Sequence, residues 1–250
     1  MSGARAHLFG VEIDRLGMDE TVSSCRELIE SRRFSQQVSI NAAKVVSLYE
    51  DPRLRAIVRR CALVNADGQS IVWASRLLRD PVPTRVAGID LMERLLELAA
   101  REQYPVFILG ARREVLARAV AVLRGRYPAL PVAGYRDGYF SDGENAAVCD
   151  EIRASGARIL FVAMGSPTKE YWIDDHRDRL GVNLAMGVGG AIDVVAGVTR
   201  RAPLLLQRMG LEWTARVWQE PSRMIRRYTV TNARFLAIFT RELHRRALAR

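Results

Sequence analysis

The segment RILFVAM, residues 158–164, is followed at once by GSPTKEYW, residues 165–172, and together they decide the fold class. An apolar run of this kind is typical of a strand buried on both faces of a sheet. The small and polar residues after it lead into a helical pattern, for which Ser166 is a candidate cap and Pro167 a candidate first residue. A buried strand that turns directly into a helix indicates a parallel α/β sheet.

The same order of strand and helix recurs along the first 200 residues. Apolar segments lie at 37–40, 62–65, 106–109, 130–135 and 183–188, and helical patterns follow them at 42–48, 68–78, 113–127, 144–155 and 191–196. We therefore predict a Rossmann-like α/β fold, with a mostly parallel sheet and helices on both faces. Residues 1–200 are predicted to form this α/β domain, and residues 201–250 a basic helical C-terminal appendage.

The chain has 250 residues, of which 49% are hydrophobic and 26% are charged. This balance is that of a globule with a sizeable core, and it excludes a disordered, collagen-like or disulfide-scaffold protein. No apolar run approaches the ~20 residues that a membrane-spanning helix needs, and residues 1–8 lack a signal-peptide pattern. Cys25, Cys61 and Cys149 lie far apart, so we expect reduced thiols in a cytoplasmic protein.

Positive charge is concentrated at the C-terminal end. The net charge of the chain is +10, and the twelve arginines and three glutamates of residues 200–250 account for +9 of it. Ser222 is a candidate cap for a helix that runs to about Ala249. Apolar residues would line one stripe of this helix and arginines much of the opposite side: Ile225, Tyr228, Phe235, Leu236, Phe239 and Leu243 against Arg223, Arg226, Arg227, Arg234, Arg241 and Arg245.

Two interpretations of this amphipathic helix stay open. It can lie on an anionic membrane surface, or it can dock its apolar stripe on the protein's own core or on a partner subunit in a homo-oligomer. A nucleic acid is not an expected partner, because aromatic and arginine side chains would stand on opposite faces instead of interleaving for base stacking.

Small and polar residues end four of the predicted strands. They are Ser39-Ile40-Asn41, Asn65-Ala66-Asp67-Gly68, Gly165 to Glu170, and Gly187-Val188-Gly189-Gly190. Ligands of open parallel sheets bind beyond the carboxyl ends of the strands, where loops and helix N-termini meet. We therefore expect the functional site at this edge of the sheet.

Asp67 is the most suggestive carboxylate of the sequence, because it directly follows a buried strand and precedes Gly68. A carboxylate at such a strand end is placed to take a proton in a cleft. Aspartate is also a common N-cap, so Asp67 could instead cap the predicted helix 68–78. Both interpretations are kept open.

The glycine run at 187–190 has two interpretations as well, a tight turn or a cradle of backbone N–H groups for a phosphate. A dinucleotide-binding G-x-G-x-x-G motif is excluded, because Ile192 stands where the third glycine belongs. The sequence contains no P-loop motif and no Asp-x-Asp, the usual signature of a metal-held nucleotide sugar. We therefore expect no metal ion and no cofactor.

Eight separated segments, in order and spacing, give the sequence a specific resemblance. They are NADGQSIVWA (65–74), RVAGIDLMERL (85–95), VFILGA (106–111), GYF (138–140), GSPTKEYW (165–172), MGVGGAIDVVAG (186–197), RRAP (200–203) and GLEWTARVWQEPSRMIRRY (210–228). Together they resemble the WecG/TagA/CpsF family of bacterial glycosyltransferases, over roughly residues 8–228.

The resemblance implies an inverting transferase with a Rossmann-like catalytic domain and a C-terminal appendage that completes the site at the membrane. Members move a sugar from a UDP-sugar, in several cases of the N-acetylmannosamine type, to an undecaprenyl-diphosphate-linked sugar. This occurs at the inner face of the cytoplasmic membrane, in teichoic acid or surface polysaccharide synthesis. Use of UDP-glucose or UDP-N-acetylmannosaminuronate is the alternative within the same family.

The resemblance also implies roles for individual residues. Asp67 matches the proposed base, and Ser39, Asn41 and Arg85 match positions that contact the donor sugar. Lys169 stands where the family has a glutamine of the sugar site, and a cation there could favour an acidic donor. The remaining implied roles are nucleotide binding by Gly110, Tyr139, Gly187, Gly189, Gly190 and Asp193, and binding of the acceptor diphosphate by Arg216, Arg223 and Arg226.

Overall fold

The computed structural model describes residues 5–203, 206, 218 and 221–248, and for 221–228 it describes only the helix that they form. In the described residues, six strands form one parallel sheet in the order β4-β3-β8-β7-β5-β6. The strands are β3 (Ser35–Ile40), β4 (Leu63–Ala66), β5 (Val106–Gly110), β6 (Val132–Arg136), β7 (Ile159–Ala163) and β8 (Leu184–Gly187). The predicted Rossmann-like α/β fold is therefore confirmed.

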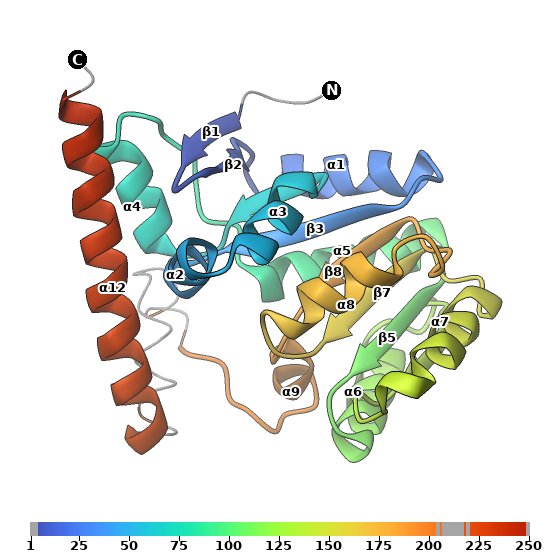
Figure 1. Cartoon of the computed structure of the whole chain (residues 1–250). Helices are drawn as coiled ribbons and strands as arrows, with labels where there is room; N and C mark the ends of the chain where they lie inside the picture. The colour runs from blue at the N-terminus through green and yellow to red at the C-terminus, as the bar shows by residue number, and fades with distance from the viewer. Residues whose placement is uncertain (1–4, 204–205, 207–217, 219–220, 249–250) are drawn as a thin grey trace.

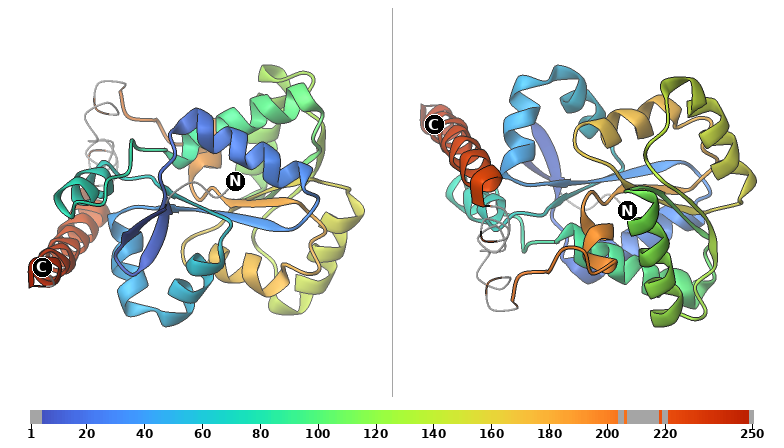
Figure 2. Two further views of the ribbon diagram at one scale, coloured as in Figure 1. Left: turned by 90° about the horizontal axis from the view of Figure 1, so that it is seen from above. Right: turned by 90° about the horizontal axis from the view of Figure 1, so that it is seen from below.

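Helices cover both faces of the sheet, as the two views of Figure 2 show. One face carries α1 (Met18–Glu30), α5 (Gly88–Glu102), α6 (Arg113–Arg126) and α9 (Ala191–Val195). The other carries α2 (Ala42–Glu50), α3 (Pro52–Arg60), α7 (Asn145–Ala154), after the short η1 (Asp142–Glu144), and α8 (Thr168–His176). Because β5, β7 and β8 are buried on both faces, their near-continuous apolar sequences are explained.

Local capping explains why the chain breaks between α2 and α3. The Asn41 side chain accepts a hydrogen bond from the Lys44 N–H (3.0 Å) and begins α2. Asp51 does the same for the Leu54 N–H (2.9 Å), with Pro52 in the first turn of α3. Both are standard helix starts. At α8, in contrast, Pro167 is the N-cap residue and Ser166 makes no capping bond, so the predicted Ser166 cap is wrong.

An antiparallel hairpin precedes the sheet and was not predicted. It consists of β1 (Arg5–Leu8) and β2 (Val11–Asp14), joined by Phe9 and Gly10, which both have positive φ. The buried Asp14 carboxylate accepts hydrogen bonds from the Arg5 Nε (2.8 Å) and from the Val64 N–H of β4 (2.7 Å). This side chain therefore ties the hairpin to the edge of the main sheet, beside α4 (Gln69–Leu77).

A long helix, α12 (Pro221–Leu248), stands along one side of the molecule and packs on α2 (Figure 1). Phe235 and Ile238 are buried in the core below it, and the Phe235 ring lies 5.6 Å from that of Phe9. Leu236 and Leu243, which were predicted on the same stripe, are 57% and 40% exposed. The stripe is therefore split between a docked face and an exposed one. No helix in the described part of the chain has the length and apolar character needed to cross a bilayer.

Candidate functional site

A cavity of about 300 Å³ opens at the carboxyl edge of the sheet, between β3 and β8. The helix after β3, α2, covers one face of the sheet, whereas α9, which follows β8, covers the other. Such a divergence is a topological switch point, where open α/β sheets bind their ligands. All four predicted strand-end segments reach this cavity, through Ser39 and Asn41, Asp67, Ser166 with Lys169 and Glu170, and Gly187 to Gly190.

Asp67 lies half-buried in the cavity wall, directly after β4. Its Oδ1 accepts a hydrogen bond from the N–H of Gly88 (3.2 Å), the first residue of α5. The N-terminus of α5 therefore stabilises the carboxylate as an anion. The helix that follows Asp67, α4, has Gly68 as its N-cap and no side-chain capping bond, so the alternative of Asp67 as its cap is wrong.

The floor of the cavity holds both lysines of the chain around one glutamate. Glu170 is 2% exposed, and its Oε1 contacts the Lys44 Nζ and the Lys169 Nζ, the latter at 2.8 Å. The Lys44 Nζ also donates to the Ser166 Oγ (2.6 Å). We call Lys44, Lys169, Glu170 and Ser166 the lysine–glutamate cluster. The second carboxylate oxygen of Glu170, Oε2, is buried without a hydrogen-bond partner in the described residues.

Burial and charge act against each other in this cluster. Burial lowers the pKa of Lys44 to about 8, although the neighbouring Glu170 carboxylate favours its charged form. Burial alone would raise the pKa of Glu170, but the two ammonium groups outweigh burial and hold that pKa below its ordinary value. The pair is therefore ionised at neutral pH. Sequence reasoning placed Glu170 in a segment expected at the site but gave it no role, and it missed Lys44, for which the only signal was that lysine is rare in this chain.

Gly187 and Lys169 depend on each other. A Cβ atom at Gly187 would lie 2.5 Å from Lys169 Cε, so only glycine lets the lysine side chain pass over the end of β8. Gly189 has a φ of 51°, in the region that favours glycine. A turn and a phosphate cradle are both compatible with this geometry.

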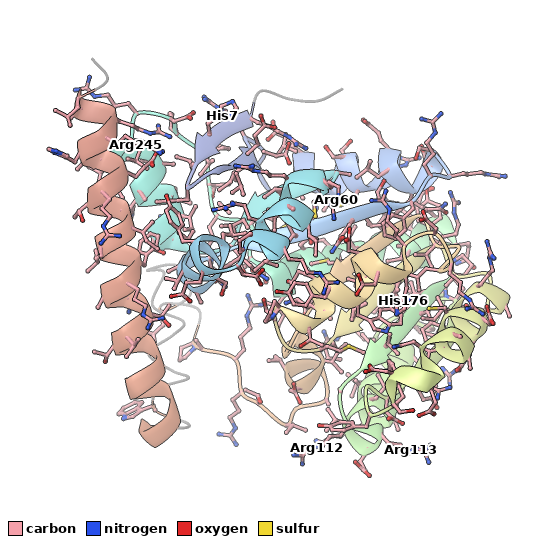
Figure 3. All side chains as sticks on the ribbon, viewed as in Figure 1. His7, Arg60, Arg112, Arg113, His176 and Arg245 are labelled. Carbon is pink, nitrogen blue, oxygen red and sulfur yellow. The ribbon has the colours of Figure 1, made fainter. Side chains whose placement is uncertain are left out.

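Four other predicted residues are not among those that line the cavity. Arg85 is half-buried in the segment between α4 and α5, and Asp193 is half-buried in α9, with its carboxylate next to Gly190. Gly110 is explained by packing, because a Cβ there would lie 2.5 Å from the Ala163 carbonyl oxygen of β7. Tyr139 is 73% exposed, beside Arg112, which Figure 3 labels at the lower edge of the molecule.

The predicted acceptor-binding arginines fall at the limit of the structure. Arg216 lies outside the described residues, and of Arg223 and Arg226 only the position on α12 is described. Further along α12, Arg234 contacts Glu50 of α2 (2.8 Å), and Arg246 bonds to the carbonyls of Leu78 (2.9 Å) and His7. These contacts hold the helix to the body of the protein.

The comparison with known families gives one finding. The description of the matching family is "Glycosyl transferase WecG/TagA/CpsF family", and its match extends over residues 6–249. It therefore spans nearly the whole chain, including every residue of the cavity and all of α12.

Proposed function

This chain belongs to the WecG/TagA/CpsF glycosyltransferase family, and we propose that it moves a sugar from a UDP-sugar to an undecaprenyl-diphosphate-linked sugar. An N-acetylmannosamine-type donor is favoured. The observation that carries the proposal is the position of Asp67, which shares one cavity with Ser39, Asn41, Lys169 and the glycine loop after β8.

In the proposed reaction, the Asp67 carboxylate removes the proton from a hydroxyl group of the acceptor sugar. The oxygen of that hydroxyl attacks the anomeric carbon of the donor, and the bond from this carbon to UDP breaks with inversion. Negative charge then develops on the diphosphate that leaves. Cations and backbone N–H groups fixed in a cavity are well suited to stabilise such charge, and we assign this role to Lys169 and the loop Gly187–Gly190.

The nucleotide itself is proposed to extend along the carboxyl edge toward Gly110, Tyr139 and Asp193. Since the sequence has no Asp-x-Asp, we propose that transfer needs no metal ion. In the described residues, no group of three or more His, Cys, Asp or Glu side chains is arranged to hold one.

A second candidate function within the same family uses a different donor, UDP-glucose or UDP-N-acetylmannosaminuronate. One observation favours an acidic donor: the Lys169 ammonium lines the cavity and is 2.8 Å from Glu170, which it shares with Lys44. Lys44, Lys169 and Glu170 together carry two positive charges and one negative charge. A carboxylate on the donor sugar would balance the excess positive charge.

We further propose that the protein works at the inner face of the cytoplasmic membrane, with α12 on the anionic surface and Arg85, Arg216, Arg223 and Arg226 near the two substrates. The lipid-linked acceptor is held in that surface, so a basic helix would bring the cavity to it. Self-association through the exposed leucines of α12 is the alternative use of this helix.

A donor panel tests the proposed function. Release of UDP is measured with UDP-N-acetylmannosamine, UDP-N-acetylmannosaminuronate and UDP-glucose, in the presence of a short-chain analogue of the lipid-linked acceptor. We expect acceptor-dependent release with one of the first two donors, unchanged by a metal chelator. Absence of release with every donor would contradict the proposal, and inhibition by the chelator would contradict its metal independence.

A further inference from the structure

A row of buried polar side chains leads from the N-terminal part of α1 to the cavity. Thr21 of α1 and Asn65 of β4 are fully buried, and Gln37 of β3 is 1% exposed. The row ends on Ser39, two residues after Gln37 on the same face of β3 and paired in register with Asn65. These four polar side chains lie between the sheet and the helix that covers it. Apolar residues could be buried there at a lower cost in free energy, so the row calls for a physical explanation.

The hydrogen bonds of this row can run in one direction only. The Thr21 hydroxyl donates to the Gly17 carbonyl (2.7 Å), which has no proton to give. Thr21 Oγ1 is therefore left to accept, from the Asn65 Nδ2 (3.0 Å). The Asn65 Oδ1 in turn accepts from the Gln37 Nε2 (3.0 Å), and the second hydrogen of that amide points to the Ser39 Oγ (3.2 Å).

The carbonyl of Gly17 thus sets the orientation of both side-chain amides. We call Thr21, Asn65 and Gln37 the amide relay. Its cost is visible at Gln37, whose Oε1 is buried without a hydrogen-bond partner in the described part of the chain. A buried acceptor that is left unpaired disfavours folding, so the stability of the fold alone does not explain the relay.

That effect is on the proton of Ser39. Because the Ser39 Oγ accepts from Gln37, its own O–H remains available to a group inside the cavity that it lines. A Cβ atom placed on Gly88 would lie 3.5 Å from the Ser39 Oγ and 3.6 Å from the Asp67 Oδ2. The hydroxyl and the carboxylate therefore border the same small space above Gly88, one as a donor and the other as an acceptor.

We propose that the amide relay is a positioning device that holds Ser39 as a hydrogen-bond donor to the sugar hydroxyl that Asp67 deprotonates. This inference rests on the proposed function. The hydroxyl oxygen of the acceptor sugar accepts a hydrogen bond from Ser39 and gives its proton to Asp67. At the same time it forms a bond to the anomeric carbon of the donor, and UDP leaves with the electron pair of the broken bond. Ser39 keeps its own proton. Asn65 and Thr21 are not among the residues that line the cavity, and Gln37, which does line it, acts through its hydrogen bond to Ser39.

The test is a double-mutant cycle on the full-length enzyme with the best donor of the panel. Gln37→Met, which keeps the side-chain length and removes the amide, is expected to lower kcat by roughly 10–100-fold, the cost of a misplaced reacting group, with a smaller change in the donor KM. In a Ser39→Ala background the same substitution is expected to change kcat less than about twofold, because a relay without its last member has nothing to position.

A second variant acts from the far end of the row, outside the cavity. Thr21→Val removes the hydroxyl that sets the direction of the relay, and Thr21→Ser, the matched control, retains it. We expect Thr21→Val to lower kcat in the wild-type background only, and Thr21→Ser to keep it, with melting temperatures showing that each variant is folded.

Equal losses of kcat in the wild-type and Ser39→Ala backgrounds would show a structural role and overturn the positioning role, while the proposed function would stand. An inactive wild-type enzyme across the whole donor panel would overturn the proposed function, and the relay's role with it.

Discussion

Glu170 is the residue on which the floor of the cavity depends, because it is buried between both lysines of the chain. Its pKa lies below the ordinary value of 4.5, since the ammonium groups of Lys44 and Lys169 outweigh the effect of burial. A carboxyl whose pKa is lowered by folding stabilises the protein above its unfolded pKa. This contribution is lost as the pH falls through the folded value.

We expect Glu170→Gln to lower the free energy of unfolding by about 3–5 kcal/mol at pH 7, because Lys44 would stay buried without a counter-charge. Urea denaturation measures this change. The difference between the wild type and the variant should narrow when the pH falls below 4.5, where the wild-type carboxyl takes up a proton as it unfolds.

An exposed ion pair supplies the control for this substitution. Arg53 and Asp175 lie 2.6 Å apart, and both side chains are about half exposed. Asp175→Asn should change the free energy of unfolding by less than about 1 kcal/mol. If Glu170→Gln cost no more than Asp175→Asn, the buried cluster would not have the importance that we assign to it.

At the scale of elements, strands buried on both faces were the easiest to predict, because their apolar residues run without interruption. The segments around β5 and β7 are clear examples. The hairpin β1–β2 was missed because each strand has four residues and exposes part of one face. Helix α1 was missed because only two of its three buried residues, Cys25 and Ile29, are apolar. The third, Thr21, is polar and donates a hydrogen bond to the Gly17 carbonyl, so the apolar pattern of the helix is interrupted.

The C-terminal helix shows what a periodic pattern leaves undetermined. The predicted helix, from about Ser222 to about Ala249, agrees with α12 within the described residues. The same pattern gave no information about which apolar residues meet the body, because this depends on where Phe9 and α2 lie in space. Phe235 and Ile238 dock there, and Leu236 and Leu243 are left exposed.

Vesicle flotation tests the membrane role that we propose for this exposed face. The full chain should float with anionic vesicles and less with neutral ones, and binding should weaken with salt, because each arginine near the surface adds about 1 kcal/mol of screened attraction. The double variant Leu236→Gln/Leu243→Gln should float less. It leaves the docked residues Phe235 and Ile238 in place.

Val198→Gln is the matched control, because Val198 is also exposed (56%) but follows α9 rather than lying on α12. It should float like the wild type. Flotation of the double variant at the wild-type level would rule out the exposed leucines as a membrane contact, and a change of its sedimentation toward monomer would favour the alternative of self-association.

For the whole molecule, the carboxyl edge of the sheet was predictable, since parallel strands place all their ends together. Ser39, Asp67, Lys169 and Gly187 do meet in one cavity. The division of the chain at residue 200 stays a prediction.

The remaining parts of the site arise from contacts between distant segments. Lys44 meets Glu170 across 126 residues of sequence, and Asn65 meets Thr21 across 44. No local pattern of the sequence marks such pairs. Arg85, which was predicted from resemblance alone, is not among the residues that line the cavity.

The measurement that tests the central claim most directly is the comparison of Asp67→Asn with the wild type, using the donor that the panel identifies. The asparagine keeps the shape of the side chain and can still meet the Gly88 N–H through its oxygen, but it cannot accept the proton of the attacking hydroxyl. We expect donor binding, measured by calorimetry, to stay within a small factor of wild type while the transfer rate falls about 10²–10⁴-fold, the typical contribution of a general base. Transfer at a near-normal rate by this variant would contradict the account.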